Sequence, residues 1–246
     1  MCVDNFFKGG LFMTKEQIVT LFKLMLEYIP PTLKIFGFTL LWSIPLGMIV
    51  ALLKMCRFKP ISWLTNIYIL IMRGTPLLLQ LIVAQYSVPY LLKWSGCPSF
   101  IHQLLDNVDI RSPRYTFNML LIAFVLNYAA YFAEIFRGGI EAIPKGQYEA
   151  AGALGFSRLQ TFFRIILPQV IKRVVPASSN EIITLVKDTS LASAIPYMEI
   201  MYIAKKQVPT YASLMPLFMA GVFYFVFATV LTLIFGYIEK KLNYYK

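Results

Sequence analysis

Long apolar runs separated by short polar segments are the main pattern of this 246-residue chain. The clearest runs cover residues 32–53, 115–136 and 212–237. The hydrocarbon core of a bilayer is about 30 Å thick, and a helix needs about 20 apolar residues to cross it. Each of these runs therefore predicts a transmembrane helix.

Two further runs contain polar residues. Residues 67–90 are interrupted at Arg73-Gly74-Thr75-Pro76, and residues 177–196 contain Asn180, Glu181, Lys187 and Asp188. We predict a span in each run. The whole pattern then predicts an all-α membrane protein with about five transmembrane helices.

The first of these spans is preceded by an amphipathic segment. Apolar residues recur at helical spacing between residues 15 and 29, with Lys and Glu elsewhere on the wheel, and Pro30 and Pro31 follow. We predict that the N-terminal segment, residues 1–30, is on the external side and contains an amphipathic helix that lies along the membrane interface before the first span. The alternative is a helix packed on the outer surface of the protein itself.

Composition and charge agree with a membrane class. The chain is 58% hydrophobic and 14% charged, whereas ordinary soluble domains are roughly 45–50% apolar. The net charge of +11 is spread between the apolar runs, so it does not form the basic stripe of a nucleic-acid binder. Because Lys and Arg favour the cytoplasmic side, their distribution predicts an external N-terminus and a cytoplasmic C-terminus.

The sequence does not contain the residue patterns that common catalytic sites need. Cys2, Cys56 and Cys97 are far apart, and the single histidine, His102, lies in the polar segment 93–113, so neither a metal site nor an intramembrane hydrolase is indicated. No segment reads GxxxxGK[ST], the P-loop that holds nucleotide phosphates. We therefore expect no enzyme activity and no cofactor in this chain.

Residues 141–168, between the third and fourth spans, are polar but regularly patterned, and we call them the coupling loop. Pro144 and Gly155 predict a short helix over 144–154, and Ser157 with Gln160 forms a capping box that starts a second helix. We predict that Pro168 kinks or ends this second helix. Small side chains between the helices let another backbone approach, which favours a docking element, although an ordinary connecting loop has the same spacing.

The residues of this loop resemble a known family pattern. Glu149-Ala150-Ala151, three residues, Gly155, nine residues, Ile165, one residue and Leu167-Pro168 match the EAA loop of ABC importer permease subunits. The stretch AEIFRGGIEAIPKGQYEAAGALG around it, RGTPLLLQ from Arg73 and KDTSL from Lys187 are similar to the polar amino acid branch of these permeases. The resemblance covers about residues 32–237 and implies a type I permease domain over residues 31–240.

The resemblance also implies partners and a location. It implies a bacterial inner-membrane subunit that pairs with a second permease copy or a relative, binds a pair of ATPase subunits that carry ATP and Mg²⁺, and takes an amino acid from an external solute-binding protein. The coupling loop would enter a groove of the ATPase, with Glu149 as the central contact and Gly155 as the turn. An ion-coupled carrier that needs no ATPase is the alternative, as is a membrane scaffold or sensor.

Charged residues within spans point to functional positions, because each costs about 2.5–3.5 kcal/mol at mid-depth. Our hypothesis is that Asp188 or Glu134 faces the solute path and meets an amino group, while Arg73 and Lys187 balance charge or hold the helices together. The alternative is that such groups only tie helices together or snorkel at their ends. Further candidates for the path are polar side chains: Thr75, Gln80, Asn127, Thr189 and Ser190.

Overall fold

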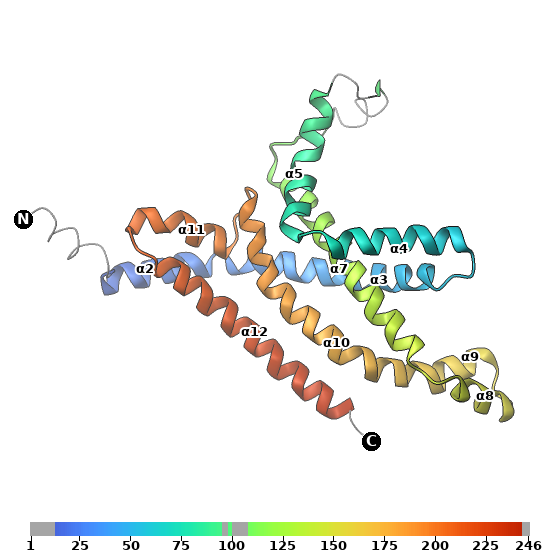
Figure 1. Ribbon diagram of the computed structural model, residues 1–246. Coiled ribbons are helices and arrows are strands. Elements are labelled where there is room, and N and C mark those ends of the chain that lie inside the picture. The colour runs from blue at the N-terminus through green and yellow to red at the C-terminus, as the bar shows by residue number, and fades with distance from the viewer. Residues whose placement is uncertain (1–12, 95–97, 100–107, 243–246) are drawn as a thin grey trace, which may run out of the picture. The chain divides into compact units, whose positions relative to one another are not determined.

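The computed structural model describes residues 13–94, 98–99 and 108–242. Cys2, Cys97 and His102 lie outside these residues, so the role of the polar segment 93–113 stays untested. The described elements are helices, and Figure 1 labels the α-helices among them: α2 (Lys15–Leu26), α3 (Ile29–Lys54), α4 (Lys59–Gly74), α5 (Leu77–Lys93), α7 (Pro113–Glu141), α8 (Lys145–Ala153), α9 (Arg158–Thr161), the π-turn η1 (Phe162–Ile166), α10 (Leu167–Asp188), the 3-10 turn η2 (Thr189–Ala194), α11 (Ile200–Tyr211) and α12 (Met215–Leu242).

Three described helices are long and apolar enough to cross a membrane: the continuous run Lys15–Lys54, α7 and α12. A fourth span results if the broken pair α4 and α5 is counted as one. The break falls at Thr75 and Pro76, where the sequence predicts an interruption. Within the described residues α10 does not meet the same criteria, so the span at residues 177–196 stays a prediction.

The described residues form two compact units, and each is described by itself. The first unit contains those of 1–38, 76–123 and 185–228, and the second contains those of 39–75, 124–184 and 229–242.

In the first unit, α2 packs against α11 and α12. Its Leu21 and Met25 form a buried cluster with Ile200 and Ala204 of α11 and Ala220 of α12. The helix begins at a capping box between Thr14 and Gln17. The amphipathic helix is therefore present, and the contact of its buried face with the same chain supports the second alternative, packing on the protein surface.

Helix α11 was not predicted from the sequence. Glu199 begins this helix, and its fully buried carboxylate accepts hydrogen bonds from the backbone N–H groups of Met201 and Tyr202 at 2.8 and 2.7 Å. The Tyr224 hydroxyl of α12 donates to the same carboxylate over 2.6 Å. Burial raises the pKa of the Glu199 carboxyl above its ordinary value, although these hydrogen bonds act in the opposite direction.

In the second unit, glycines allow close helix contacts. A Cβ on Gly47 of α3 would lie 2.7 Å from Cβ of Phe132 in α7. A Cβ on Gly139 of α7 would overlap the Val174 side chain in α10, because it would lie closer than van der Waals contact allows. Small residues at such contacts are typical of membrane helix packing, so both positions require glycine for steric reasons.

Candidate coupling loop and charge cluster

The first helix of the coupling loop ends at a left-handed glycine. Helix α8 follows Pro144 and stops at Leu154, and Gly155 has a φ of +78°. The N–H of Gly155 donates to the carbonyl of Gly152 and that of Phe156 to the carbonyl of Ala151, at 3.0 and 3.1 Å. These two bonds make a Schellman motif, which satisfies carbonyls at the helix end and reverses the chain.

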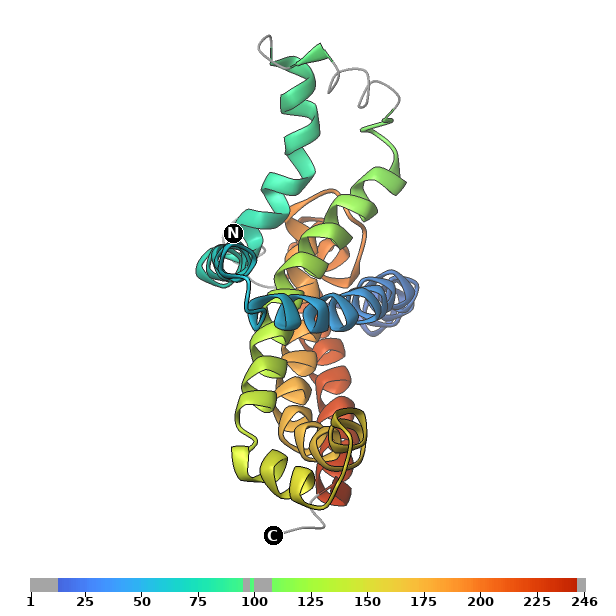
Figure 2. The same ribbon diagram turned by 90° about the vertical axis from the view of Figure 1, so that its right-hand side faces the viewer.

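The second helix begins at the predicted capping box. Gln160 N–H donates to the Ser157 hydroxyl at 3.3 Å, and Ser157 N–H donates to the Gln160 side chain at 2.9 Å. Figures 1 and 2 show α8 and α9 meeting at this tight turn.

Of the two effects predicted for Pro168, a kink or an end of the second helix, the structure contradicts the end. The chain stays helical from Arg158 through the π-turn η1 into α10, and Pro168 is the second residue of α10. In the π-turn the N–H of Leu167 bonds back to the carbonyl of Phe162, so the hydrogen-bond register changes just before the proline, which has no N–H to donate. The second arm of the loop is therefore continuous with a long helix.

Buried side chains between the two arms of the coupling loop, which we call the buried seam, hold the arms together. Ala151, Thr161 and Ile166 are buried, and the Gln169 amide of α10 donates to Gln147 of α8 at 3.2 Å. The two arms are thus held to each other by packing and a hydrogen bond.

The outer face of the loop presents the predicted contact residues. Glu149, Ala150 and Gly155 are exposed, whereas Ala151 faces the seam. Among the later members of the motif, Pro168 is exposed and Ile165 and Leu167 are half-buried.

Two leucines beside the turn were missed at the sequence level. Leu154 is 75% exposed and Leu159 is 72% exposed. The signal that could have found them is two large apolar side chains on either side of a glycine turn in a polar loop. Exposed apolar groups at a convex turn are suited to a partner's groove.

A cluster of charges in the second unit joins α3, α4 and α7. Glu134 Oε1 lies 2.5 Å from Lys54 Nζ, and Glu134 Oε2 lies 2.7 Å from Arg137 and 3.9 Å from Arg73. Arg137 also pairs with Glu141 at 2.5 Å. We call these five residues the charge cluster. Its geometry is that of the alternative in which intramembrane charges tie helices together.

A cavity of about 390 Å³ adjoins the charge cluster. Its described lining comes from α3, α4 and α7: Lys54, Asn66, Ile69, Leu70, Arg73, Gly74, Tyr131 and Glu134. The Arg73 guanidinium lies over the Tyr131 ring, 5.2 Å from its centroid. Lys54, Asn66 and Tyr131 were not among the predicted site residues, because nothing local in the sequence shows that they meet Glu134.

Comparison with known proteins identifies the family. Residues 43–244 match the family described as "Binding-protein-dependent transport system inner membrane component". The chain belongs to this family. It is 36% identical over 220 residues to the arginine transport system permease protein ArtQ of Bacillus subtilis (strain 168), covering 89% of this chain and 92% of that protein. It is 37% identical over 219 residues to the octopine transport system permease protein OccM of Rhizobium meliloti, covering 89% and 85%.

A solved structure shares the fold. The crystal structure of an amino acid ABC transporter with histidines aligns with a TM-score of 0.75 and 30% identity, covering 94% of this chain and 99% of that chain. The all-α, type I ABC permease fold is thereby confirmed. This permease is a multi-pass inner-membrane component that works with an ATPase and a solute-binding protein, and it is a transport subunit rather than an enzyme. The ion-coupled carrier is not favoured.

The predicted path residues of the permease fall into two groups. Arg73, Thr75, Asn127 and Glu134 belong to the second unit, where buried Asn127 donates to the carbonyl of Met72 at 2.9 Å and so ties α7 to α4. Thr75 donates to the carbonyl of Ile71 at the end of α4. Their role in a path stays a prediction.

The other group belongs to the first unit. Gln80 lies on α5, which contacts η2, and the remaining candidates follow one another from the end of α10 into η2: Lys187, Asp188, Thr189 and Ser190. Thr189 is fully buried and donates to the carbonyl of Val186, whereas Lys187 is exposed. Exposure makes Lys187 the more accessible of the two.

Proposed function

We propose that this permease forms the membrane path of an ATP-driven importer of polar amino acids and receives energy through the coupling loop. The observation that carries the proposal is the exposed turn at Gly155, which presents Glu149, Leu154 and Leu159 on a braced pair of helices. ATP and Mg²⁺ would be held by the partner ATPase pair, and a second permease copy or relative would complete the path.

The continuity of the second arm supports a lever mechanism. Helix runs from Arg158 to Asp188, interrupted only by the π-turn. One end of this helical segment is the proposed ATPase contact, and the other carries the path candidates Lys187 and Asp188. A displacement of the loop by the ATPase would therefore act directly on α10, and rigid-body motion suits a transporter with two alternating states.

The substrate class is inferred from relatives and from charge. The relatives are named for arginine and octopine transport, and the solved structure for amino acids. An amino acid carries an ammonium and a carboxylate. In the first unit, Asp188 offers an acceptor for the first and Lys187 a partner for the second. Glu134, the other candidate acceptor, has its carboxylate bound by Lys54 and Arg137.

The proposed orientation places the coupling loop and the C-terminus in the cytoplasm and the N-terminus outside. Basic residues near the inner ends of the helices support this direction, including Lys54 in the last turn of α3 and Lys240 and Lys241 in the last turn of α12.

Co-purification tests the coupling role. Deleting residues 149–155 should abolish association with the ATPase subunit while leaving the permease inserted in the membrane. A matched deletion of seven residues, 106–112, which precede α7 in the chain, should retain association. Retained association in the first variant would contradict the proposal.

A further inference from the structure

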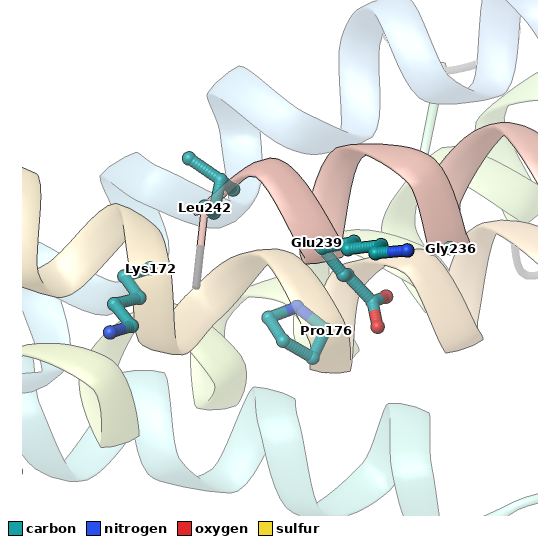
Figure 3. A pocket seen from close by; sticks show the side chains of 6 residues that line it. Lys172, Pro176, Gly236, Glu239 and Leu242 are labelled. Carbon is teal, nitrogen blue, oxygen red and sulfur yellow. The ribbon is translucent and has the colours of Figure 1, made fainter. Parts of the chain in front are cut away.

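A cavity of about 440 Å³ lies between α10 and α12 in the second unit, apart from the charge cluster and the coupling loop. Its described lining comes from these two helices: Lys172, Pro176, Gly236, Glu239, Lys240 and Leu242. Figure 3 shows Lys172 and Glu239 on either side of Pro176. None of the residues proposed for the solute path lines this cavity.

Two backbone features keep the space open. Pro176 lies inside α10 and has no N–H to donate to the carbonyl of Lys172. The proline ring would also clash with that carbonyl in a straight helix. Gly236 of α12 carries no side chain, and a Cβ built there would meet nothing within 4 Å. The cavity is therefore a consequence of the sequence of both helices.

The lining charges favour a ligand with one negative charge. Lys172 and Lys240 supply two ammonium groups, and Glu239 supplies one carboxylate. Ammonium groups bind phosphate oxygens as point charges, while a carboxylate accepts hydrogen bonds from hydroxyl groups. A phosphate diester that carries hydroxyl groups would satisfy both kinds of group.

The position of the cavity along α12 corresponds to the depth of lipid headgroups. The most apolar window of α12 is only 6% buried within the chain, so this helix offers a long apolar face. Next to Gly236, Tyr237 is 69% exposed, and the last turn carries Lys240 and Lys241. An exposed aromatic followed by lysines is typical of the membrane interface. Basic pockets between membrane helices at this depth bind anionic lipid headgroups.

We infer that this cavity binds the headgroup of phosphatidylglycerol, with Lys172 and Lys240 on the phosphate and Glu239 accepting from the glycerol hydroxyls. The inference goes beyond the proposed function, because it needs only that α12 lies in the membrane. It holds whichever solute is carried.

Native mass spectrometry of the purified complex in detergent, with equal phosphatidylglycerol and phosphatidylethanolamine, tests this site. The wild-type complex should retain phosphatidylglycerol in preference. K172Q/K240Q should weaken that retention about thirtyfold, since each basic residue near a membrane surface contributes about a factor of five. K172R/K240R should restore it.

The matched control is R173Q/K241Q, which removes the same charge one position further along each helix, outside the described lining of the cavity. This control should retain phosphatidylglycerol as the wild type does. An equal loss in both double variants would overturn the proposal in favour of diffuse attraction. Displacement of the lipid by excess inorganic phosphate would overturn it in favour of a simple phosphate site, and loss of a protein subunit from K172Q/K240Q with lipid retained would assign the cavity to a protein partner.

Discussion

Lys54 and Glu134, 80 positions apart in the chain, form an ion pair with 2.5 Å between Nζ and Oε1. The second oxygen of Glu134 faces Arg137 and, at 3.9 Å, Arg73. One carboxylate therefore faces three cations from three helices. Charges in a membrane protein are tolerated when they are paired in this way, so Glu134 is the centre on which the cluster depends.

Replacing Glu134 by Gln should destabilise the permease strongly. The side chain is part-buried, with 16% exposed, so the loss should approach about 3–5 kcal/mol, which is what removal of one partner costs a fully buried ion pair. Thermal unfolding of the detergent-solubilised complex, followed by intrinsic fluorescence, measures the effect. Glu141→Gln is the matched control, because Glu141 pairs with the same Arg137 but is 52% exposed, and it should cost less than about 1 kcal/mol. Wild-type stability of Glu134→Gln together with lost uptake would instead assign Glu134 to the solute path.

Replacing Gly155 by Ala should weaken coupling. The φ of +78° disfavours any residue with a Cβ by about 1–2 kcal/mol, so the Schellman turn should distort and misplace Glu149 and Leu154. The expected result is reduced ATPase association in a pull-down from membranes. Gly146→Ala serves as the control, because Gly146 lies in α8 without a positive φ and its Cβ would meet nothing within 4 Å. Equal association of the two variants would show that the turn geometry is irrelevant to docking.

The exposed leucines give a separate prediction. Leu154→Ser and Leu159→Ser should leave the stability of the permease within about 0.5 kcal/mol, because surface substitutions rarely cost more. Each should nevertheless lower the affinity for the ATPase about tenfold, as expected when a buried interface leucine is truncated. Leu214→Ser, at a 60% exposed leucine between α11 and α12, should bind normally. Binding by microscale thermophoresis distinguishes these results, and unaltered affinity in both loop variants would count against an apolar contact there.

The buried Glu199 carboxyl predicts a pH dependence of stability. Its pKa is raised above the ordinary value of 4.5, first by burial, so the folded state binds the proton more tightly than the unfolded state. The associated stability is present below pH 4.5 and is lost as the pH rises through the raised pKa. Tyr224→Phe removes a hydrogen bond that lowers this pKa, and the loss should then extend to higher pH. Melting curves across pH should become flatter in Glu199→Gln, whereas the exposed control Glu16→Gln should follow the wild-type curve.

Local patterns predicted much of the fold and of the coupling loop. Apolar runs of about 20 residues predicted the helices α3, α7 and α12. This was possible because a membrane span is recognised from the length and composition of a single segment, without knowledge of its packing partners. The capping box at Ser157 and the turn at Gly155 were also predictable, since both motifs are formed by residues within five positions of each other. Helix ends and turns of this kind are local chemistry.

Features that depend on packing could not be predicted in this way. The partners of Glu134 come from different helices, and nothing near Lys54 or Arg73 in the sequence identifies them. The helix through Pro168 depends on a π-turn that changes the hydrogen-bond register. The sequence did hold a signal for α11, namely Glu199 followed by apolar residues at Ile200, Ile203 and Ala204, but its two lysines made it resemble an external loop.

Uptake into proteoliposomes tests whether transport by this permease depends on an ATPase that acts through the coupling loop. Vesicles would contain the permease with its ATPase, and labelled arginine would be supplied outside with the solute-binding protein, with glutamine, glutamate and cystine as competitors. Uptake should require ATP inside the vesicles and the ATPase subunit, and the binding protein with its solute should stimulate ATP hydrolysis. Deleting residues 149–155 should abolish both the uptake and the stimulation. Uptake driven by an ion gradient in vesicles that lack the ATPase would contradict this dependence on the ATPase.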